Sequence, residues 1–288
     1  MTRVIELVRR GPTLSFEFFP PSTDEGRTNL DRCVDAIGDA ASFVSVTYGA
    51  GGSSRERTRD LVMAIDGSSP YPAMPHLTCV GHTRDEVVAM LHEYRDAGIV
   101  NVLALAGDPP ADGSPVTGDF TYASELVELV HEVGDFGVAV AAFPEGHPRS
   151  ASLAEDRRLL AAKLSAADLG IANFFFRLDD YLAMRDDLAA RGCDTPVLPG
   201  IMPMLNPQTI RRFAAINGAS LPEDLIAAVE SASSPEDAFE IAMDAAIELA
   251  LATLREGAPG VHMYCLNRAD VAAWTVANLD LGVSSEAG

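Results

Sequence analysis

Short apolar segments alternate with longer helical patterns along most of the chain. Eight segments rich in β-branched and aromatic residues have the length and composition of buried strands. They are residues 14–19, 43–48, 74–79, 100–107, 137–143, 171–176, 195–201 and 261–265. The pattern therefore predicts eight strands separated by helices.

The segment DEVVAMLHEYRDAG illustrates the helical pattern. Its large apolar side chains recur at helical spacing and share one face. These residues are Val87, Met90, Leu91 and Tyr94. Thr83 or Asp85 is expected to begin this helix, and Gly98 to end it.

Eight strand and helix units favour a closed barrel, because parallel strands need crossover helices and closure leaves no exposed edge. We expect a (β/α)8 TIM barrel that forms a single catalytic domain over residues 1–288. The main alternative is an open, doubly wound sheet. Residues 202–259 are expected to contain extra helices, and the C-terminal tail is expected to be frayed.

The composition limits the classes of function. The chain has 288 residues, is 48% hydrophobic and carries a formal net charge of -21. Such an acidic protein lacks the clustered Lys and Arg that nucleic acid binding requires. Charges interrupt every apolar run near the N-terminus, so we expect no signal peptide, no membrane association and a cytoplasmic location.

The cysteines and histidines give no sign of a metal or disulfide site. Cys33, Cys79, Cys193 and Cys265 lie far apart, and no His cluster has metal-ligand spacing. We therefore expect reduced, partly buried thiols and no metal. The oligomeric state stays open.

Glu17 is a charged residue inside the apolar segment LSFEFF. Side chains of a strand alternate between its faces, so if Phe16 and Phe18 face the helices, Glu17 points into the barrel mouth. Active sites of such barrels form at the C-terminal ends of the strands. Burial raises the pKa of a carboxyl group, which suits a general acid. The alternative is a structural acid paired with a buried arginine or with the backbone.

Other candidates lie near strand ends. Asp108 closes ALAGDPP, and with Glu17 it would place two carboxylates on one rim, one to donate a proton and one to stabilise a cation. Taken alone, Asp-Pro-Pro is equally an ordinary turn. The glycine-rich TYGAGG loop could bind phosphate or simply form a tight turn. His76 could likewise be a core histidine.

Nine motifs carry a family resemblance. They are FEFFPP, FVSVTYGAGGSSRERT, PHLTC, ALAGDPP, YASELV, FPEGHP, NFFF, PGIMP and YCLNRAD. In this order, over nearly the whole chain, they resemble the methylenetetrahydrofolate reductase family. The resemblance implies a (β/α)8 barrel that usually carries FAD and reduces 5,10-methylenetetrahydrofolate to 5-methyltetrahydrofolate with NADH or NADPH. This reaction belongs to one-carbon metabolism and methionine biosynthesis.

The resemblance also implies roles for individual residues. Glu17 matches the catalytic acid that helps to open the one-carbon bridge to an iminium cation, and Asp108 matches an aspartate beside the folate pterin. Phe213 matches a phenylalanine that stacks on folate or nicotinamide, and Arg268 a position proposed to meet the folate glutamate tail. Asn173 lies at the family's substrate-binding glutamine. The flavin-binding surface is matched by Thr47, His76, Gly107, Tyr122, Ala123, His147, Asp156 and Lys163.

Several positions depart from the family pattern. Ala106 and Ala162 stand where basic residues are typical, which removes positive charge from a pocket for a pyrophosphate. The other departures are Phe143 for tyrosine, Leu159 for a polar amide, Asn173 for glutamine and Arg177 for aspartate. A charge-assisted hydrogen bond contributes about 1.5–3 kcal/mol. Because two basic partners of the pyrophosphate are missing, we expect FAD to bind weakly or not at all. NADH is then expected to pass its hydride directly to folate.

We therefore expect an NAD(P)H-dependent methylenetetrahydrofolate reductase that binds a reduced folate and a nicotinamide dinucleotide. One alternative is a catalytically silent barrel that binds folate or a nucleotide. Another is a related flavin-dependent barrel oxidoreductase that acts on a substrate such as proline. The choice between NADH and NADPH stays open, because no acidic ribose-reading residue occurs in a Rossmann context.

Overall fold

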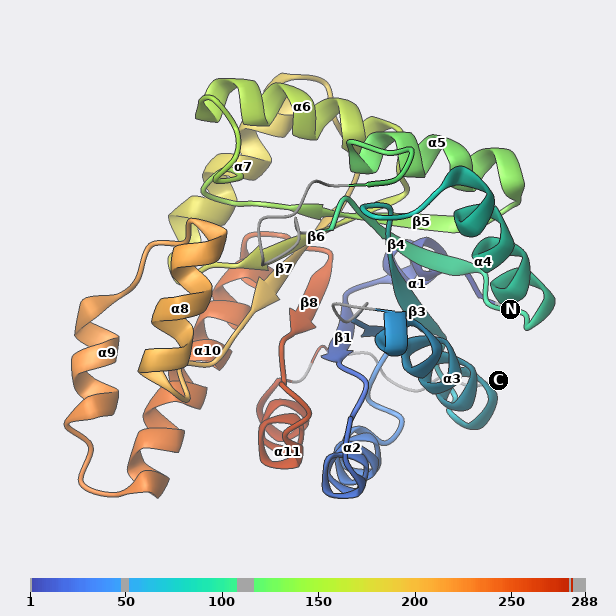
Figure 1. The fold of residues 1–288 in the computed structure, drawn as a ribbon. Coiled ribbons are helices and arrows are strands. Elements are labelled where there is room, and N and C mark those ends of the chain that lie inside the picture. Colours follow the sequence, from blue (N-terminus) through green and yellow to red (C-terminus); the bar gives the residue numbers. More distant parts are fainter. Residues whose placement is uncertain (1, 48–51, 108–116, 280, 282–288) are drawn as a thin grey trace.

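The centre of the molecule is a closed barrel of eight parallel strands that follow one another in chain order (Figure 1). The computed structural model describes residues 2–47, 52–107, 117–279 and 281. The strands are β1 (Thr13–Phe18), β2 (Phe43–Val46), β3 (Ala73–Thr78), β4 (Asn101–Leu105), β5 (Gly137–Ala142), β6 (Leu169–Phe174), β7 (Val197–Ile201) and β8 (Gly260–Met263). The (β/α)8 prediction is confirmed, and the open, doubly wound alternative is wrong.

Most of the helices surround the strands on the outside of the barrel (Figure 1). The helices are α1 (Val4–Arg10), α2 (Asp24–Ile37), α3 (Gly52–Ser68), α4 (Arg84–Asp96), α5 (Ala123–Val133), α6 (Leu153–Ser165), α7 (Leu178–Ala190), α8 (Pro207–Asn217), α9 (Glu223–Glu230), α10 (Pro235–Arg255) and α11 (Ala269–Asn278). Three of these, α8 to α10, lie between β7 and β8 and group together at the left of Figure 1. The tail predicted to be frayed is residues 279–288. Its first residue, Leu279, is buried in the outer core and Leu281 packs against that core, so the prediction is wrong for these two residues. Residues 280 and 282–288 lie outside the described residues.

Helix α4 shows how local sequence sets an element. Thr83 is its N-cap and forms a capping box with Glu86, which satisfies amide groups that the first helical turn leaves without partners. The four apolar residues predicted to share one face are all buried, so the predicted helix is confirmed. Gly98 follows the helix with φ of 87°, a conformation that glycine adopts without strain.

Two apolar cores lie on the two sides of the strands. Phe16 and Phe18 belong to the large outer core between the barrel and its helices. A smaller core inside the barrel combines strand residues such as Phe43 and Met74 with Val4 and Ile5 of α1. Helix α1, which the sequence pattern did not reveal, therefore closes the N-terminal end of the barrel.

A third apolar cluster joins α8, α9 and α10 to the ends of β6 and β7. Its buried members include Phe174, Met202 and Met204, and Phe213 packs against them. Because these side chains lie beside the C-terminal ends of the strands, this cluster carries one wall of the barrel mouth.

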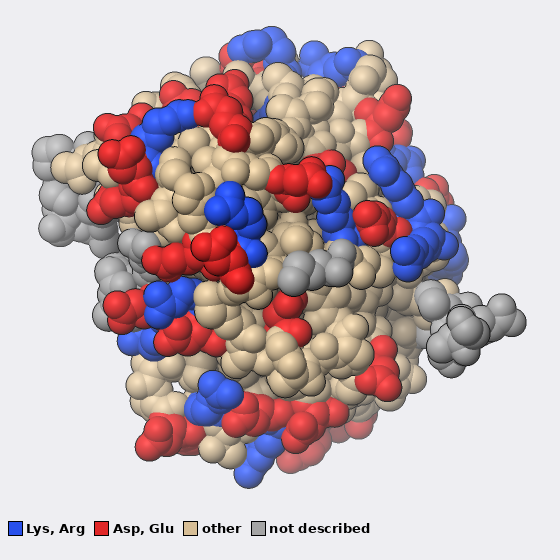
Figure 2. All heavy atoms as spheres, turned by 90° about the vertical axis from the view of Figure 1, so that its right-hand side faces the viewer, with Lys and Arg blue, Asp and Glu red and all other residues tan. Residues whose placement is uncertain are grey.

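Acidic and basic side chains are interspersed over most of the face drawn in Figure 2. Some salt bridges among exposed residues pair near neighbours, for example Arg27 with Asp31 and Arg158 with Glu155, and others join two helices, for example Arg84 with Glu132. Among the helices of the described residues, none combines the length and apolar character needed to cross a membrane.

Candidate active site

Glu17 lies on the inner face of β1, opposite to the face that buries Phe16 and Phe18. Its carboxylate oxygen Oε2 is 3.4 Å from His76 Nε2 and 3.8 Å from His262 Nε2. The Glu17 side chain keeps 19% of its surface exposed, whereas the two histidines are buried. The described surroundings of this carboxylate are thus two imidazoles at the barrel mouth, and no buried arginine pairs with it there.

His262 was missed by the sequence analysis, although the alternation used for Glu17 could have found it. Val261 and Met263 belong to the outer core, so the intervening His262 must point inward. Its Nδ1 lies 2.8 Å from the hydroxyl of Ser15, and its Nε2 lies 3.5 Å from the hydroxyl of Ser45. These contacts orient the ring so that Nε2 faces Glu17.

Tyr264 completes this side of the mouth. Its ring meets that of His262 edge to face, with 5.3 Å between the centroids, and its hydroxyl donates to the carbonyl of Ala172 at 3.1 Å. Burial, reinforced by the charge of Glu17, raises the pKa of Tyr264 well above its ordinary value. Tyr264 is therefore a neutral donor that holds the His262 ring in place.

His76 is the second imidazole beside Glu17. Burial, opposed by the charge of Glu17 and assisted by the nearby His262, lowers the pKa of His76 to about 4. His76 is therefore neutral at physiological pH, and its buried Nε2 makes no hydrogen bond in the structure. The Glu17 carboxylate lies 3.4 Å from this nitrogen.

The lowered pKa of His76 predicts a pH-dependent stability. The unfolded chain takes up a proton on this residue below about pH 6.5, whereas the folded protein resists it down to about pH 4, so stability falls as the pH drops through this range. Between about pH 7 and pH 4.5, wild type should lose about 2 kcal/mol more than His76→Gln. Urea unfolding at both pH values measures this difference, and equal losses would show that burial of His76 is not the cause.

Asp108 lies outside the described residues, so its predicted place beside Glu17 remains a prediction. The residue before it, Gly107, is described and has φ of 89°. A Cβ atom at this position would collide with the side chain of Val80. Both the backbone conformation and the close approach therefore require glycine here. The TYGAGG loop also falls largely outside the described residues, at positions 48–51.

Two predicted flavin-surface residues are engaged inside the protein. Buried Asp156 accepts hydrogen bonds from the backbone amide of His147 at 2.9 Å and from the hydroxyl of Ser150 at 2.9 Å. Lys163 donates from Nζ to the carbonyl of Ala141 at 2.7 Å, and burial lowers the pKa of its ammonium to about 8. Both charged groups thus already have partners at the end of β5.

Arg157 is a further residue that the sequence analysis missed. It is 2% exposed, and its guanidinium donates to the carbonyl of Phe143 at 2.9 Å and to the carbonyl of Pro144. It also contacts Asp156 at 3.1 Å and Asp187 at 3.6 Å. A charged residue in a helix usually faces solvent, so only the fold reveals that Arg157 fastens the loop after β5.

The other predicted site residues lie at the same end of the barrel but form no single cluster. Asn173 accepts a hydrogen bond from the amide of Phe174 at 2.9 Å, and Phe213 joins the third apolar cluster. The guanidinium of Arg268 pairs with Asp270 and lies 5.6 Å from the ring of Phe239. Thr47 follows β2, while Tyr122 and Ala123 begin α5, with Tyr122 66% exposed.

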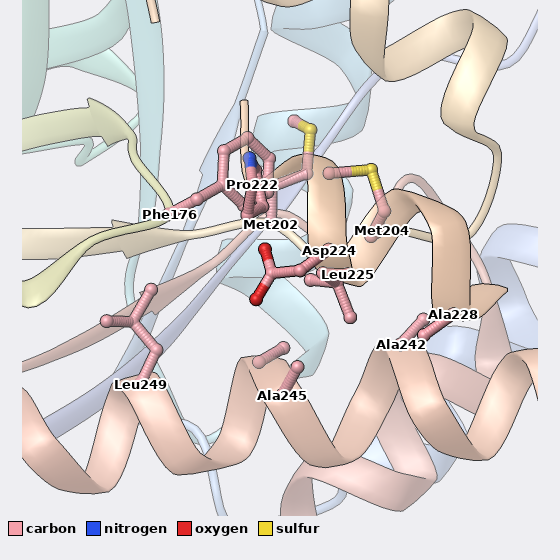
Figure 3. Close-up of a pocket in the computed structure, with 11 residues that line it drawn as sticks. Phe176, Met202, Met204, Pro222, Asp224, Leu225, Ala228, Ala242, Ala245 and Leu249 are labelled. Carbon is pink, nitrogen blue, oxygen red and sulfur yellow. The ribbon is translucent and has the colours of Figure 1, made fainter. Parts of the chain in front are cut away.

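A pocket of about 360 Å³ lies beside the mouth, between the end of β7 and helices α9 and α10 (Figure 3). Its walls are mostly apolar, and the carboxylate of Asp224 points into it. Because its lining holds no basic residue, this pocket does not suit a pyrophosphate or a folate glutamate tail.

The structure offers no metal centre within its described part. No group of three or more His, Cys, Asp or Glu side chains there could hold a metal ion. All four cysteines are free and buried, more deeply than the partly buried thiols predicted from the sequence.

Comparisons with known proteins agree with the geometry. The sequence model of the methylenetetrahydrofolate reductase family matches residues 3–280. The chain is 36% identical over 262 residues to 5,10-methylenetetrahydrofolate reductase of Escherichia coli, covering 90% of this chain and 87% of that protein. It is 32% identical over 297 residues to methylenetetrahydrofolate reductase (NADH) 1 of Arabidopsis thaliana, covering 97% of this chain and 50% of that longer protein.

A solved structure extends the likeness at the level of the fold. An uncharacterized protein from Clostridium thermocellum, which binds two copies of 5-methyl-5,6,7,8-tetrahydrofolic acid, matches with a TM-score of 0.64 at 12% identity. The match covers 96% of this chain and 98% of that chain. At this identity the likeness concerns the barrel alone. With its family model matched almost from end to end and relatives above 30% identity, the chain belongs to the methylenetetrahydrofolate reductase family.

Proposed function

We propose that this protein reduces 5,10-methylenetetrahydrofolate to 5-methyltetrahydrofolate, with NADH or NADPH as the hydride donor. The observation that carries the proposal is the carboxylate of Glu17, held at the barrel mouth beside His76 and His262. A protein that only binds folate does not need an acid enclosed in this way. Family membership adds independent support.

The proposed chemistry begins with proton transfer. Glu17 donates a proton to the nitrogen that leaves the one-carbon bridge, and the bond between that nitrogen and the bridging carbon breaks. The resulting iminium carbon accepts a hydride from the nicotinamide and becomes the methyl group. The net change is one hydride and one proton added to the folate, with the nicotinamide oxidised.

Other residues that match the family's site take supporting roles in this proposal. Asp108 stabilises the iminium cation beside the pterin ring, and Asn173 binds the substrate. Phe213 stacks on folate or nicotinamide. Arg268 meets the folate glutamate tail, for which it must leave its present partner Asp270.

We propose further that FAD binds weakly or not at all. Bound FAD would relay the hydride from nicotinamide to folate, as it does in the family. Here Lys163 donates to a backbone carbonyl, and Asp156 already accepts from His147 and Ser150. Ala106 and Ala162 offer no charge in place of the basic residues typical of the family. Without such partners, a diphosphate loses bonds worth about 1.5–3 kcal/mol each. These residues fit FAD poorly, and direct hydride transfer follows as the proposed route.

Purified protein should therefore lack stoichiometric flavin absorbance near about 450 nm, yet oxidise NADH when methylenetetrahydrofolate is present. The measurement is NADH absorbance with and without folate, before and after FAD is added. A folate-dependent rate that appears only with FAD would refute direct transfer and leave the reductase proposal standing. No folate-dependent rate under either condition would refute both.

A further inference from the structure

Two loops meet beside the barrel mouth through a pair of hydrogen bonds. Glu145 follows β5, and Ser220 lies in the link between α8 and α9. The backbone amide of Ser220 donates to one carboxylate oxygen of Glu145 at 2.8 Å, and the Ser220 hydroxyl donates to the other oxygen. Because both carboxylate oxygens accept a hydrogen bond, the contact sets the orientation of Ser220 relative to Glu145 as well as the distance between them.

The Glu145 side of this contact is firmly anchored. Arg157 binds the carbonyls of Phe143 and Pro144, the two residues just before Glu145. Asp156 binds the amide of His147, two residues after it. Glu145 is thus held from both sides by buried charged groups at the start of α6.

The Ser220 side leads directly to α8. Gly218 ends this helix with φ of 71° and approaches Pro148 of the opposite loop, since a Cβ atom on Gly218 would lie 3.6 Å from the Pro148 Cβ. Arg211 forms two hydrogen bonds of 3.0 Å with Glu223, which join α8 to α9. Helix α8 carries Phe213, which also packs against the third apolar cluster, so the Ser220 contact helps to set the position of that ring.

The opposite side of the α8–α9 segment combines packed side chains with a pocket. The pocket beside the mouth separates Leu225 and Ala228 of α9 from Ala245 and Leu249 of α10 (Figure 3). Ile226 and Val229 of α9 are buried together with Ala242 of α10, so the two helices pack against each other around this pocket. The contact between Glu145 and Ser220 adds a polar link on the side of the mouth.

We propose that Glu145 is a positioning residue that holds α8, and with it Phe213, against the barrel mouth through Ser220. Its kinetic consequence rests on the proposed function, because Phe213 is there the residue that stacks on substrate. In this proposal Glu145 acts through Ser220 and not by contact with folate or nicotinamide. Loss of the contact should weaken substrate binding more than it slows the chemical step.

The test compares Glu145→Ala, Ser220→Ala and the double variant. Glu145→Ala removes both hydrogen bonds and should raise KM for folate or NADH about fivefold to tenfold, with kcat changed less than about twofold. Ser220→Ala keeps the bond from the backbone amide and should raise KM less. The double variant should be no worse than Glu145→Ala, because Glu145→Ala already removes the whole contact. Multiplied effects in the double variant would overturn the proposal.

Glu145→Gln serves as the conservative variant. Its amide can accept from the Ser220 backbone and donate to the Ser220 hydroxyl, so KM should return close to the wild-type value. Glu155→Ala is the matched control, because it removes the same charge and an exposed salt bridge on nearby α6. Equal KM changes in Glu145→Ala and Glu155→Ala would show a general charge effect and refute the role of the contact.

Hydrogen exchange separates this inference from the proposed function, since it needs no activity. Amides of residues 207–217 should exchange faster in Glu145→Ala and Ser220→Ala, and at the wild-type rate in Glu155→Ala. Unchanged exchange in the first two variants would refute the positioning role even if the enzyme is active. Faster exchange in a protein without reductase activity would support the contact and refute the proposed function.

Discussion

Replacing Glu17 with glutamine should lower kcat by about 10²–10⁴-fold, the typical contribution of a general acid. Glutamine keeps the size and hydrogen-bonding capacity of the side chain beside His76 and His262, but it has no acidic proton to give. Folate affinity should change little, because the lost interaction belongs to the transition state. Steady-state kinetics gives kcat, and equilibrium titration with 5-methyltetrahydrofolate gives the affinity.

Thr28→Ala is a suitable control for this experiment, because Thr28 is an exposed residue of α2 that bonds only to the carbonyl of Asp24. It should leave both kcat and folate affinity unchanged. If Glu17→Gln retained full turnover, Glu17 would not be the acid. If wild type bound folate tightly without turnover, the chain would be the catalytically silent binder considered from the sequence.

Replacing Arg157 with methionine should destabilise the protein by about 3 kcal/mol, the lower end of the cost of breaking a buried ion pair. Methionine fills a similar volume but removes the cation in contact with Asp156 and leaves the carbonyls of Phe143 and Pro144 without their donor. Urea unfolding at neutral pH gives the change in the free energy of unfolding.

Arg158→Met provides the matched control, one position along the same helix. Arg158 is exposed and pairs only with Glu155 on the surface of α6, so its loss should have little effect on stability. Similar destabilisation in both variants would mean that the loss of positive charge from an acidic protein matters, rather than the burial of Arg157.

The local sequence was sufficient to predict those helices and strands that depend on residues close together along the chain. The eight strands lie within two residues of their predicted ends, since runs of β-branched and aromatic residues bury both faces of a parallel sheet. The α4 helix follows from Thr83, Glu86 and its apolar face. The inward direction of Glu17 follows from the alternation of β1, because Phe16 and Phe18 must face the outer core.

Sequence patterns did not predict the contacts between segments that lie far apart along the chain. Helix α1 is recognised only in the structure, where it packs against the core inside the barrel. Its seven residues form too short an apolar pattern to predict a helix. His262 reaches Glu17 across 245 residues of sequence when β8 closes against β1. The sequence showed that Ala106 and Ala162 replace basic residues typical of the family, but it did not show that Lys163 donates to the carbonyl of Ala141.

The sequence by itself determined the barrel, the family and the acid on β1, because periodicity and motif order are local properties that survive without coordinates. Only the tertiary structure decided which groups surround that acid, and that Arg157 is buried rather than solvated. It also revealed that Glu145 meets Ser220 across 75 residues. The reason is physical: barrel closure brings together side chains whose separation along the chain says nothing about their distance in space.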